Sequence, residues 1–214
     1  MPAYAININL VRRVLQAVED DNKPKAVKLC KDAILRAELR MDPANKVRYE
    51  AAKKILYKPG SYPSYLCACW QDENTMLWYM TDTRVVFRLK KPIAHLPLLD
   101  ADRQHPENER LAKLFEYVKS NANVVVRLDP DKLSKYRKLA IDVDVSKPFD
   151  VGNGILDLGG AFVQTKYLPL IFDILASDNI VMSFYNNRNE INNHVLFECD
   201  NGDVLLAQYI VQEE

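Results

Sequence analysis

Apolar positions in the last fifty residues change their spacing in an order typical of a strand, a helix and three further strands. Residues 161–165 form a short segment that contains β-branched and aromatic residues, as is typical of a strand. Runs at residues 180–185, 194–199 and 204–211 predict the three later strands. Between the first strand and the three later ones, Thr165 is placed to cap a helix. The apolar residues of this helix recur at intervals of three and four: Leu168, Ile171, Phe172 and Leu175.

The last two of these strands are predicted to form a β-hairpin around Asp200-Asn201-Gly202-Asp203. Asn-Gly favours a type I′ turn, because that turn needs a positive φ at both central residues. If the helix packs on the strands, their apolar residues form one core. We expect the following side chains to be largely buried: Leu168, Ile171, Leu175, Ile180, Met182, Phe184, Val195, Phe197, Leu205 and Tyr209.

The first sixty residues carry the spacing of helices. Residues 4–8 predict a short strand, after which Asn9 is placed to cap a first helix. Two more helices are predicted at about 23–57, the second of them opened by Asp42 as a cap and Pro43 at the first helical position. The apolar stripe of the earlier one consists of Val27, Cys30, Ile34, Ala37 and Met41.

The middle of the chain changes to the alternation of strands. Residues 62–70, 76–81 and 84–89 predict three strands. A helix is predicted after Pro106, then a strand at 124–128 and a short helix that begins at Asp129-Pro130. Four glycines, at positions 152, 154, 159 and 160, are typical of turns or bulges before the final unit.

These patterns predict an α+β protein with an antiparallel sheet covered by helices. Strand, helix and three strands occur in that order at both ends of the chain, and a helical pair at about 23–57 interrupts the first copy. We therefore expect a single domain over residues 1–214, with a first unit at 1–100 and a second at 101–214.

Charge is unevenly distributed although the chain is neutral overall. Residues 1–60 have a net charge of +6, residues 61–139 of +3 and residues 140–214 of −9. A basic front and an acidic back suggest a polarised surface, or two solvated faces that bind nothing. They also allow the basic region of one subunit to pair with the acidic region of the next.

Two stretches and the order of elements resemble the sliding clamp of the bacterial replicative DNA polymerase, a processivity factor. Clamp domains contain two such units, and the first tends to end in an alanine-Thr-Asp-Gly-x-Arg-like stretch; this chain has Met80-Thr81-Asp82-Thr83-Arg84. Residues 162–168, 174–175 and 180–211 are similar to the closing unit of the last clamp domain. Thr83 replaces the clamp glycine and predicts a different turn geometry, while the helices at 23–57 have no counterpart in a standard clamp domain.

The resemblance implies a clamp-like fold whose helices present Lys and Arg to the phosphates of duplex DNA. Such contacts do not depend on base sequence and weaken with salt. Pairing with Glu19, Glu38 and Glu50 would instead make these cations ordinary solvated helix faces. The cations expected to contact phosphates are Arg12, Arg13, Lys25, Lys28, Lys31, Arg36, Lys53 and Lys54.

Catalytic and metal chemistry have little support in the sequence. Asp82, Asp100 and Asp102 could be combined into a carboxylate cluster, but the latter two fall in a Pro-rich segment that nothing fixes near the first. The three histidines lack the spacing of metal ligands or of a triad. We expect no metal and no cofactor, and buried, reduced thiols at Cys30, Cys67, Cys69 and Cys199.

We therefore expect a non-catalytic accessory or interaction protein of DNA metabolism, encoded by a phage or another mobile element. The alternative is a protein–protein interaction module, an inhibitor or scaffold, that has the same fold and does not touch DNA. Self-association is open in both cases, and an enzyme is the least favoured class. The chain lacks a signal-peptide pattern at Met1-Pro2-Ala3-Tyr4 and an apolar run long enough to span a membrane, so the expected location is the cytoplasm.

Overall fold

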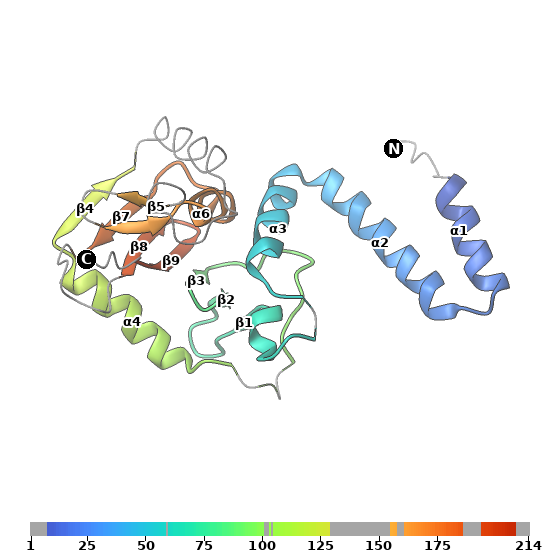
Figure 1. The fold of residues 1–214 in the computed structure, drawn as a ribbon, viewed down its shortest axis with the longest axis horizontal. Helices are drawn as coiled ribbons and strands as arrows, with labels where there is room; N and C mark the ends of the chain where they lie inside the picture. Colours follow the sequence, from blue (N-terminus) through green and yellow to red (C-terminus); the bar gives the residue numbers. More distant parts are fainter. Residues whose placement is uncertain are drawn as a thin grey trace. The chain divides into compact units, whose positions relative to one another are not determined.

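The computed structural model describes residues 8–58, 60–100, 103, 105–128, 155–157, 161–185 and 194–208 (Figure 1). Contacts between residues group the chain into two compact units, 1–46 and 47–214. The sequence patterns had suggested one domain with its internal boundary near residue 100. Each unit is described separately.

The first unit is a helical hairpin. Helix α1 spans Ile8–Glu19 and α2 spans Lys23–Met41, and the two pack against each other across a three-residue turn. The Asn22 side chain caps α2 by accepting a hydrogen bond from the backbone N–H of Lys25, 3.1 Å away. The prediction that Asn9 is a cap is wrong, because α1 already includes Ile8. Ile8 is likewise not the end of a strand, and the rest of the strand predicted at 4–8 lies outside the described residues.

Helix α3, Pro43–Ile55, leads into the second unit and confirms the predicted cap. The Asp42 side chain accepts a hydrogen bond from the backbone N–H of Asn45 at 2.9 Å, and Pro43 follows it. Arg48 donates from Nε to the carbonyl oxygen of Ile174 at 2.9 Å, which ties α3 to the C-terminal part of the chain. The two helices predicted at about 23–57 are thus confirmed as α2 and α3.

A seven-stranded antiparallel sheet forms the centre of the second unit, which confirms the α+β class. Its strand order is β1-β2-β3-β9-β8-β7-β4, so the C-terminal strand β9 joins the two halves of the sheet. The bounds are β1 Trp70–Gln71, β2 Trp78–Thr81, β3 Val85–Leu89, β4 Val124–Arg127, β7 Val181–Phe184, β8 His194–Cys199 and β9 Gly202–Ala207.

The C-terminal unit has the predicted order of elements. Strand β6, Phe162–Gln164, precedes helix α6, Tyr167–Leu175, and then come β7, β8 and β9. Strand β6 pairs with β5, Ile155–Asp157, in a separate two-stranded sheet. Thr165 does not cap α6: the cap position is Lys166, which makes no side-chain capping bond.

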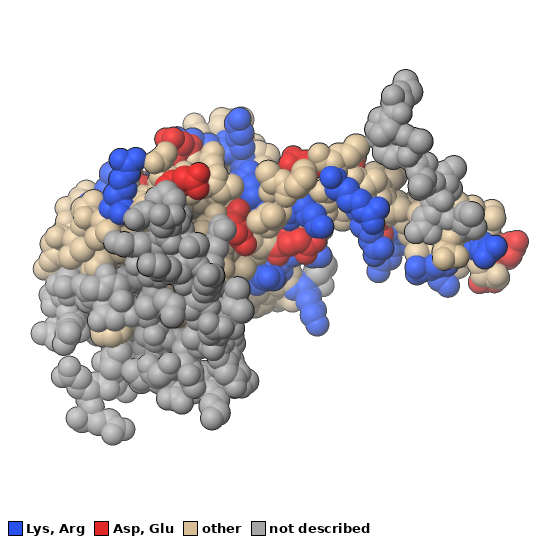
Figure 2. Space-filling model, turned by 90° about the horizontal axis from the view of Figure 1, so that it is seen from above, with Lys and Arg blue, Asp and Glu red and all other residues tan. Residues whose placement is uncertain are grey.

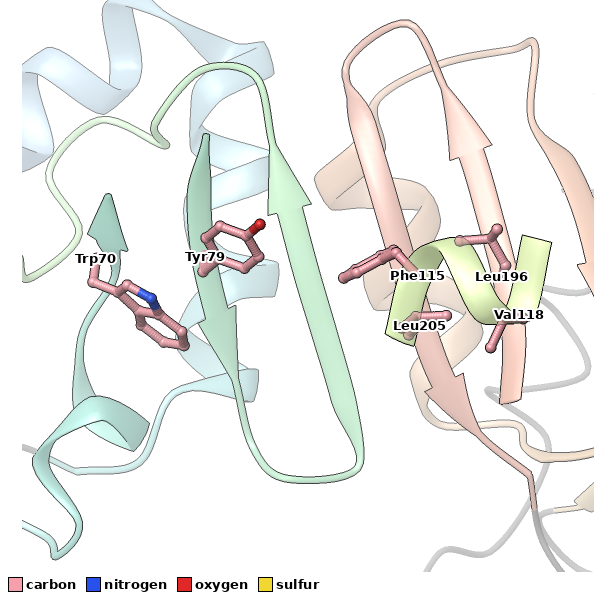
Figure 3. Close-up of a cluster of buried hydrophobic side chains, with 6 residues drawn as sticks. All are labelled: Trp70, Tyr79, Phe115, Val118, Leu196 and Leu205. Carbon is pink, nitrogen blue, oxygen red and sulfur yellow. The ribbon is translucent and has the colours of Figure 1, made fainter. Parts of the chain in front are cut away.

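Helices cover both faces of the sheet. Helix α4, Asn108–Asn121, packs Phe115 and Val118 against Leu196 and Leu205 (Figure 3). The next residue of β8, Phe197, points to the other face, because side chains alternate along a strand. There its ring lies 6.4 Å from that of Phe172 on α6. Burial from both sides explains why β8 contains a continuous apolar run.

The predicted C-terminal core is confirmed as far as it is described. Nine of its ten side chains are at most 3% exposed, and the tenth, Tyr209, lies outside the described residues. The short helix predicted at Asp129-Pro130 and the glycines at 152, 154, 159 and 160 also lie outside them.

The strand predicted at 62–70 is wrong. Residues Ser64–Cys67 form a 3₁₀ helix, and only Trp70 belongs to a strand. The backbone hydrogen bonds of the segment go to loops: Cys69 donates to Pro97, and Leu99 donates to Cys69. Strands at 76–81, 84–89 and 124–128 and the helix after Pro106 are confirmed as β2, β3, β4 and α4.

The turn between β2 and β3 has a left-handed residue although it contains no glycine. Thr83 has a φ of +79°, a conformation that favours glycine. Hydrogen bonds from the Thr83 N–H to Thr81 Oγ1 and from the Arg84 N–H to Asp82 Oδ1, each 2.9 Å, hold the turn. Asp82 also accepts a 2.7 Å bond from the Tyr167 hydroxyl, which fastens α6 to the turn. Burial is the main cause that raises the pKa of Tyr167.

Candidate interaction surface

Small residues line the contact between α1 and α2. Ala17 and Ala26 are buried, three residues before the turn and four residues after it, so each faces the other helix of the antiparallel hairpin. The next layers away from the turn pair half-buried Val14 with Leu29 and Leu10 with Ala33. Two alanines thus occupy the contact nearest the turn, and several other, larger apolar residues of each helix lie outside the contact.

Those larger residues are exposed to solvent. Their exposed fractions lie between 41% and 61%, whereas Ala17 and Ala26 of the same helices are 0% and 7% exposed. Cys30 is exposed as well, so the prediction that it is buried is wrong. The exposed apolar residues of the hairpin, called the apolar face below, are Val11, Leu15 and Val18 of α1 and Val27, Cys30, Ile34 and Met41 of α2.

The two helices direct these residues to the same side of the hairpin. A helix turns by about 100° per residue, which places Val18 about 100° beyond Ala17 and Val27 about 100° beyond Ala26 in the same sense. Because the helices run in opposite directions, equal rotations away from the shared contact lead to one side. The apolar residues of α1 and α2 therefore form a continuous surface.

The predicted phosphate-contacting cations are exposed and fall into two groups. Six of them, from Arg12 to Arg36, lie on the hairpin, whereas Lys53 and Lys54 lie on α3 in the second unit. Figure 2 shows Lys and Arg side chains projecting along the helices, with Asp and Glu between them. Among the described residues, none of the eight forms an ion pair with an acid; Lys53 lies over the Tyr49 ring at 5.3 Å.

On α2 the cations lie mostly away from the apolar face. Lys25 is nine residues from Ile34, and Arg36 is nine residues from Val27. Nine residues are two and a half turns, so the two members of each pair project on opposite sides of the helix. Lys31 stands nearer, at the edge of the apolar face. One helix thus presents two different surfaces, apolar on one side and mostly basic on the other.

The described part of the second unit contains a cavity of about 380 Å³ beside Trp70. Trp70 lies between the rings of Tyr79 and His105, at 5.8 Å and 5.7 Å, and donates from Nε1 to Asn108 Oδ1 at 2.9 Å. The contacts with Tyr79 and Asn108 connect β1 to β2 and to the start of α4; Figure 3 shows Trp70 and Tyr79 on their strands. Because Trp70 and Tyr79 are buried, they serve packing and do not offer their faces to nucleic-acid bases.

Asp72 lies in the cavity wall, and its buried carboxylate stabilises the turn between β1 and β2. It accepts hydrogen bonds from the Thr75 hydroxyl and the Asn74 N–H, and its own carbonyl receives the N–H of Met76. The Thr75 hydroxyl is the main cause that lowers the pKa of Asp72. All these bonds close the turn between β1 and β2, so Asp72 is held as an anion within its own turn.

The described residues contain neither a metal-binding cluster nor a helix that could span a membrane. Within these ranges no three His, Cys, Asp or Glu side chains gather closely enough to hold a metal ion. None of the helices described is both long and apolar enough to cross a bilayer. Asp102 of the carboxylate cluster considered above lies outside the described residues.

Comparisons of the chain with protein-family models, with curated proteins and with solved structures found no match. The resemblance to the sliding clamp therefore remains a prediction from the quoted residues and the element order. In the structure, the order of strand, helix and three strands is present at the C-terminal end. Sequence analysis located the stripe on α2 by its spacing but did not indicate that it would face solvent.

Proposed function

We propose that this chain is a non-catalytic protein-interaction module that docks a protein surface through the apolar face of its helical hairpin. The exposure of that face supports the proposal. Large apolar side chains clustered on one side of a soluble protein mark interaction sites more often than chance placement, whereas single exposed ones carry no such meaning. Here seven such residues share one side of two helices.

The hairpin buries few side chains of its own, which also supports the proposal. In the described part of the first unit, the buried side chains are Ala17, Ala26 and Leu39. Helices gain most of their stability in proteins from packing an apolar face, and two alanines and a leucine supply little of it. Covering the apolar face would supply further stability to the two helices. We therefore expect docking of a partner to stabilise the folded hairpin.

Replacing Val27 and Ile34 together by glutamate is expected to abolish docking, because each change would bury an unpaired charge in the complex. The matched control is Lys25→Gln with Arg36→Gln, which makes the same change of −2 in charge on the opposite side of the same helix. Each protein would carry an affinity tag and be recovered from cells that produce it. We expect the same stoichiometric companion, another protein or a second copy, with the parent and the control and its loss with the glutamate variant. Equal recovery with all three would contradict the proposal.

Contact with DNA phosphates is a second candidate function, favoured by the six exposed cations of the hairpin. A titration of labelled duplex at about 50 mM salt should then show binding that ignores base sequence and weakens with salt, with a slope of about 0.9 per neutralised phosphate. Because the cations occupy two units, two variants separate their roles. We expect Lys28→Glu with Lys31→Glu to remove more affinity than Lys53→Glu with Lys54→Glu. No binding at tens of micromolar protein would exclude this function.

A further inference from the structure

We infer that the occupant of the apolar face is a second copy of this chain, and that two helical hairpins join through their apolar faces as a four-helix bundle. The inference rests on the proposed function and names its partner. Three features carry it: the spacing of the apolar residues, the size of the face and the charges at its edge.

The spacing on α2 is that of a helix that packs on other helices. Val27, Cys30, Ile34, Ala37 and Met41 are separated by three, four, three and four residues. This is the alternation of the two apolar positions of a heptad, and it presents a straight seam to a neighbouring helix. Residues 11, 15 and 18 of α1 continue the same alternation. A partner must offer an apolar helical surface of like spacing, and the chain itself supplies one.

The size of the face fits a small dimer. The 19 residues of α2 and the 12 of α1 give lengths of about 28 Å and 18 Å, and each helix is about 10 Å wide. The projected area is roughly 460 Å² per copy, below the roughly 800 Å² that each partner buries in a standard interface, so the dimer is expected to be weak and to depend on protein concentration. Closed two-fold dimers, in which both copies use the same patch, are the commonest protein assemblies.

Charges are compatible with two copies related by a two-fold axis across α2. Lys31 and Glu38 lie seven residues apart, on the same edge of the apolar face. A two-fold axis perpendicular to the helix reverses their order in the second copy, so opposite charges can meet along the edge. Lys25 and Arg36 project on the other side of α2 and stay away from the contact, which avoids repulsion between copies.

Cys30 provides a native probe of the contact. It lies within the apolar face and is the exposed cysteine of the four, whereas Cys67 and Cys69 are buried and Cys199 is half-buried. In the dimer Cys30 would be covered. Its rate of alkylation should therefore fall as protein concentration rises, while the slower reaction of Cys199 stays constant and serves as the internal reference.

The test uses the full chain in sedimentation velocity and in timed alkylation, from about 1 µM to about 200 µM, the range in which a small interface associates. We expect a monomer that becomes a dimer, with Cys30 protected in parallel. Val27→Glu with Ile34→Glu should weaken association at least about 100-fold, whereas Lys25→Gln with Arg36→Gln should leave it unchanged. Circular dichroism of both variants would establish that the helices remain.

Three results would overturn the inference. A monomer at every concentration, with Cys30 freely reactive, would exclude the second copy but leave the proposed function open to a different protein in the recovery experiment. A dimer that survives the glutamate changes would place the contact elsewhere. A monomer in which Cys30 is protected at every concentration would show that the chain covers the face itself, which would remove the proposed function as well.

Discussion

Replacing Phe197 by alanine is expected to lower the free energy of unfolding by about 3–5 kcal/mol, the cost typical of removing a buried aromatic ring. The Phe197 side chain is fully buried in the middle of β8, where its neighbours across the sheet are Met182 of β7 and Val204 of β9. Its ring meets that of Phe172 edge-on, at an interplanar angle of 77°. The cavity left by the ring would lie between the sheet and α6, where both layers are already fixed.

Urea unfolding followed by tryptophan fluorescence would measure this loss, because Trp70 is buried in the same unit. The matched control is Val125→Ala, in β4 at the edge of the same sheet, where 66% of the side chain is exposed. Exposed substitutions usually change stability by no more than about 0.5 kcal/mol. If both variants unfold at the same urea concentration, the packing of α6 on the sheet described here is not the protein's core.

The C-terminal unit was predictable because its signals are local. The helix at 167–175 and the strands around it follow from apolar spacings within a few residues, and two-sided burial of the sheet agrees with the apolar run in β8. The segment at 62–70 is the counter-example. It is rich in aromatic residues, but Leu66 bonds within a 3₁₀ turn and to Tyr57, and Cys69 bonds to residues 97 and 99, which are distant in the sequence. The local alternation does not indicate these partners.

The apolar face shows a different limit of sequence analysis. The spacing on α2 predicts that the helix has an apolar side, and the structure confirms the helix. The same spacing does not say whether a sheet, a second helix or another molecule covers that side. On α1 and α2, Ala17 and Ala26 are buried in the contact, whereas Val18 and Val27, one position further along each helix, remain outside it.

The hairpin between β8 and β9 was predicted, but its turn has a different construction. Gly202 pairs with Cys199, so the turn consists of Asp200 and Asn201, and neither has the positive φ that a type I′ turn requires. Contacts with distant residues explain this outcome. The Asn201 side chain donates to the carbonyl oxygen of Leu175 at 2.7 Å, at the end of α6, and its own carbonyl accepts from Lys90. Asn201 therefore terminates a helix instead of completing an isolated hairpin.

Gly202 is required at the start of β9 for two separate reasons, and its replacement by alanine should show both. Its φ is +149°, a region that side chains rarely adopt. A Cβ atom would also overlap the carbonyl oxygen of Arg88 and lie 2.9 Å from the Cα of Leu89. Both obstacles are backbone atoms of β3, which pairs with β9 where the two halves of the sheet meet, so relief would require β3 and β9 to separate.

We expect Gly202→Ala to cost about 2–6 kcal/mol, from about 1–3 kcal/mol of backbone strain and about 1–3 kcal/mol of overpacking. Gly60→Ala is the control that divides the two costs, because Gly60 also has a positive φ, +88°, but no atom lies within 4 Å of its added Cβ. Urea unfolding of both variants measures the difference. A larger loss for Gly202→Ala would locate the excess in the contact between β3 and β9, whereas equal losses would mean that backbone conformation alone selects glycine there. Strand β9 is hydrogen-bonded to both β3 and β8. If Gly202→Ala displaces β9, the backbone amides of β3 should exchange their hydrogens faster with solvent. Gly60→Ala should leave the exchange of these amides unchanged.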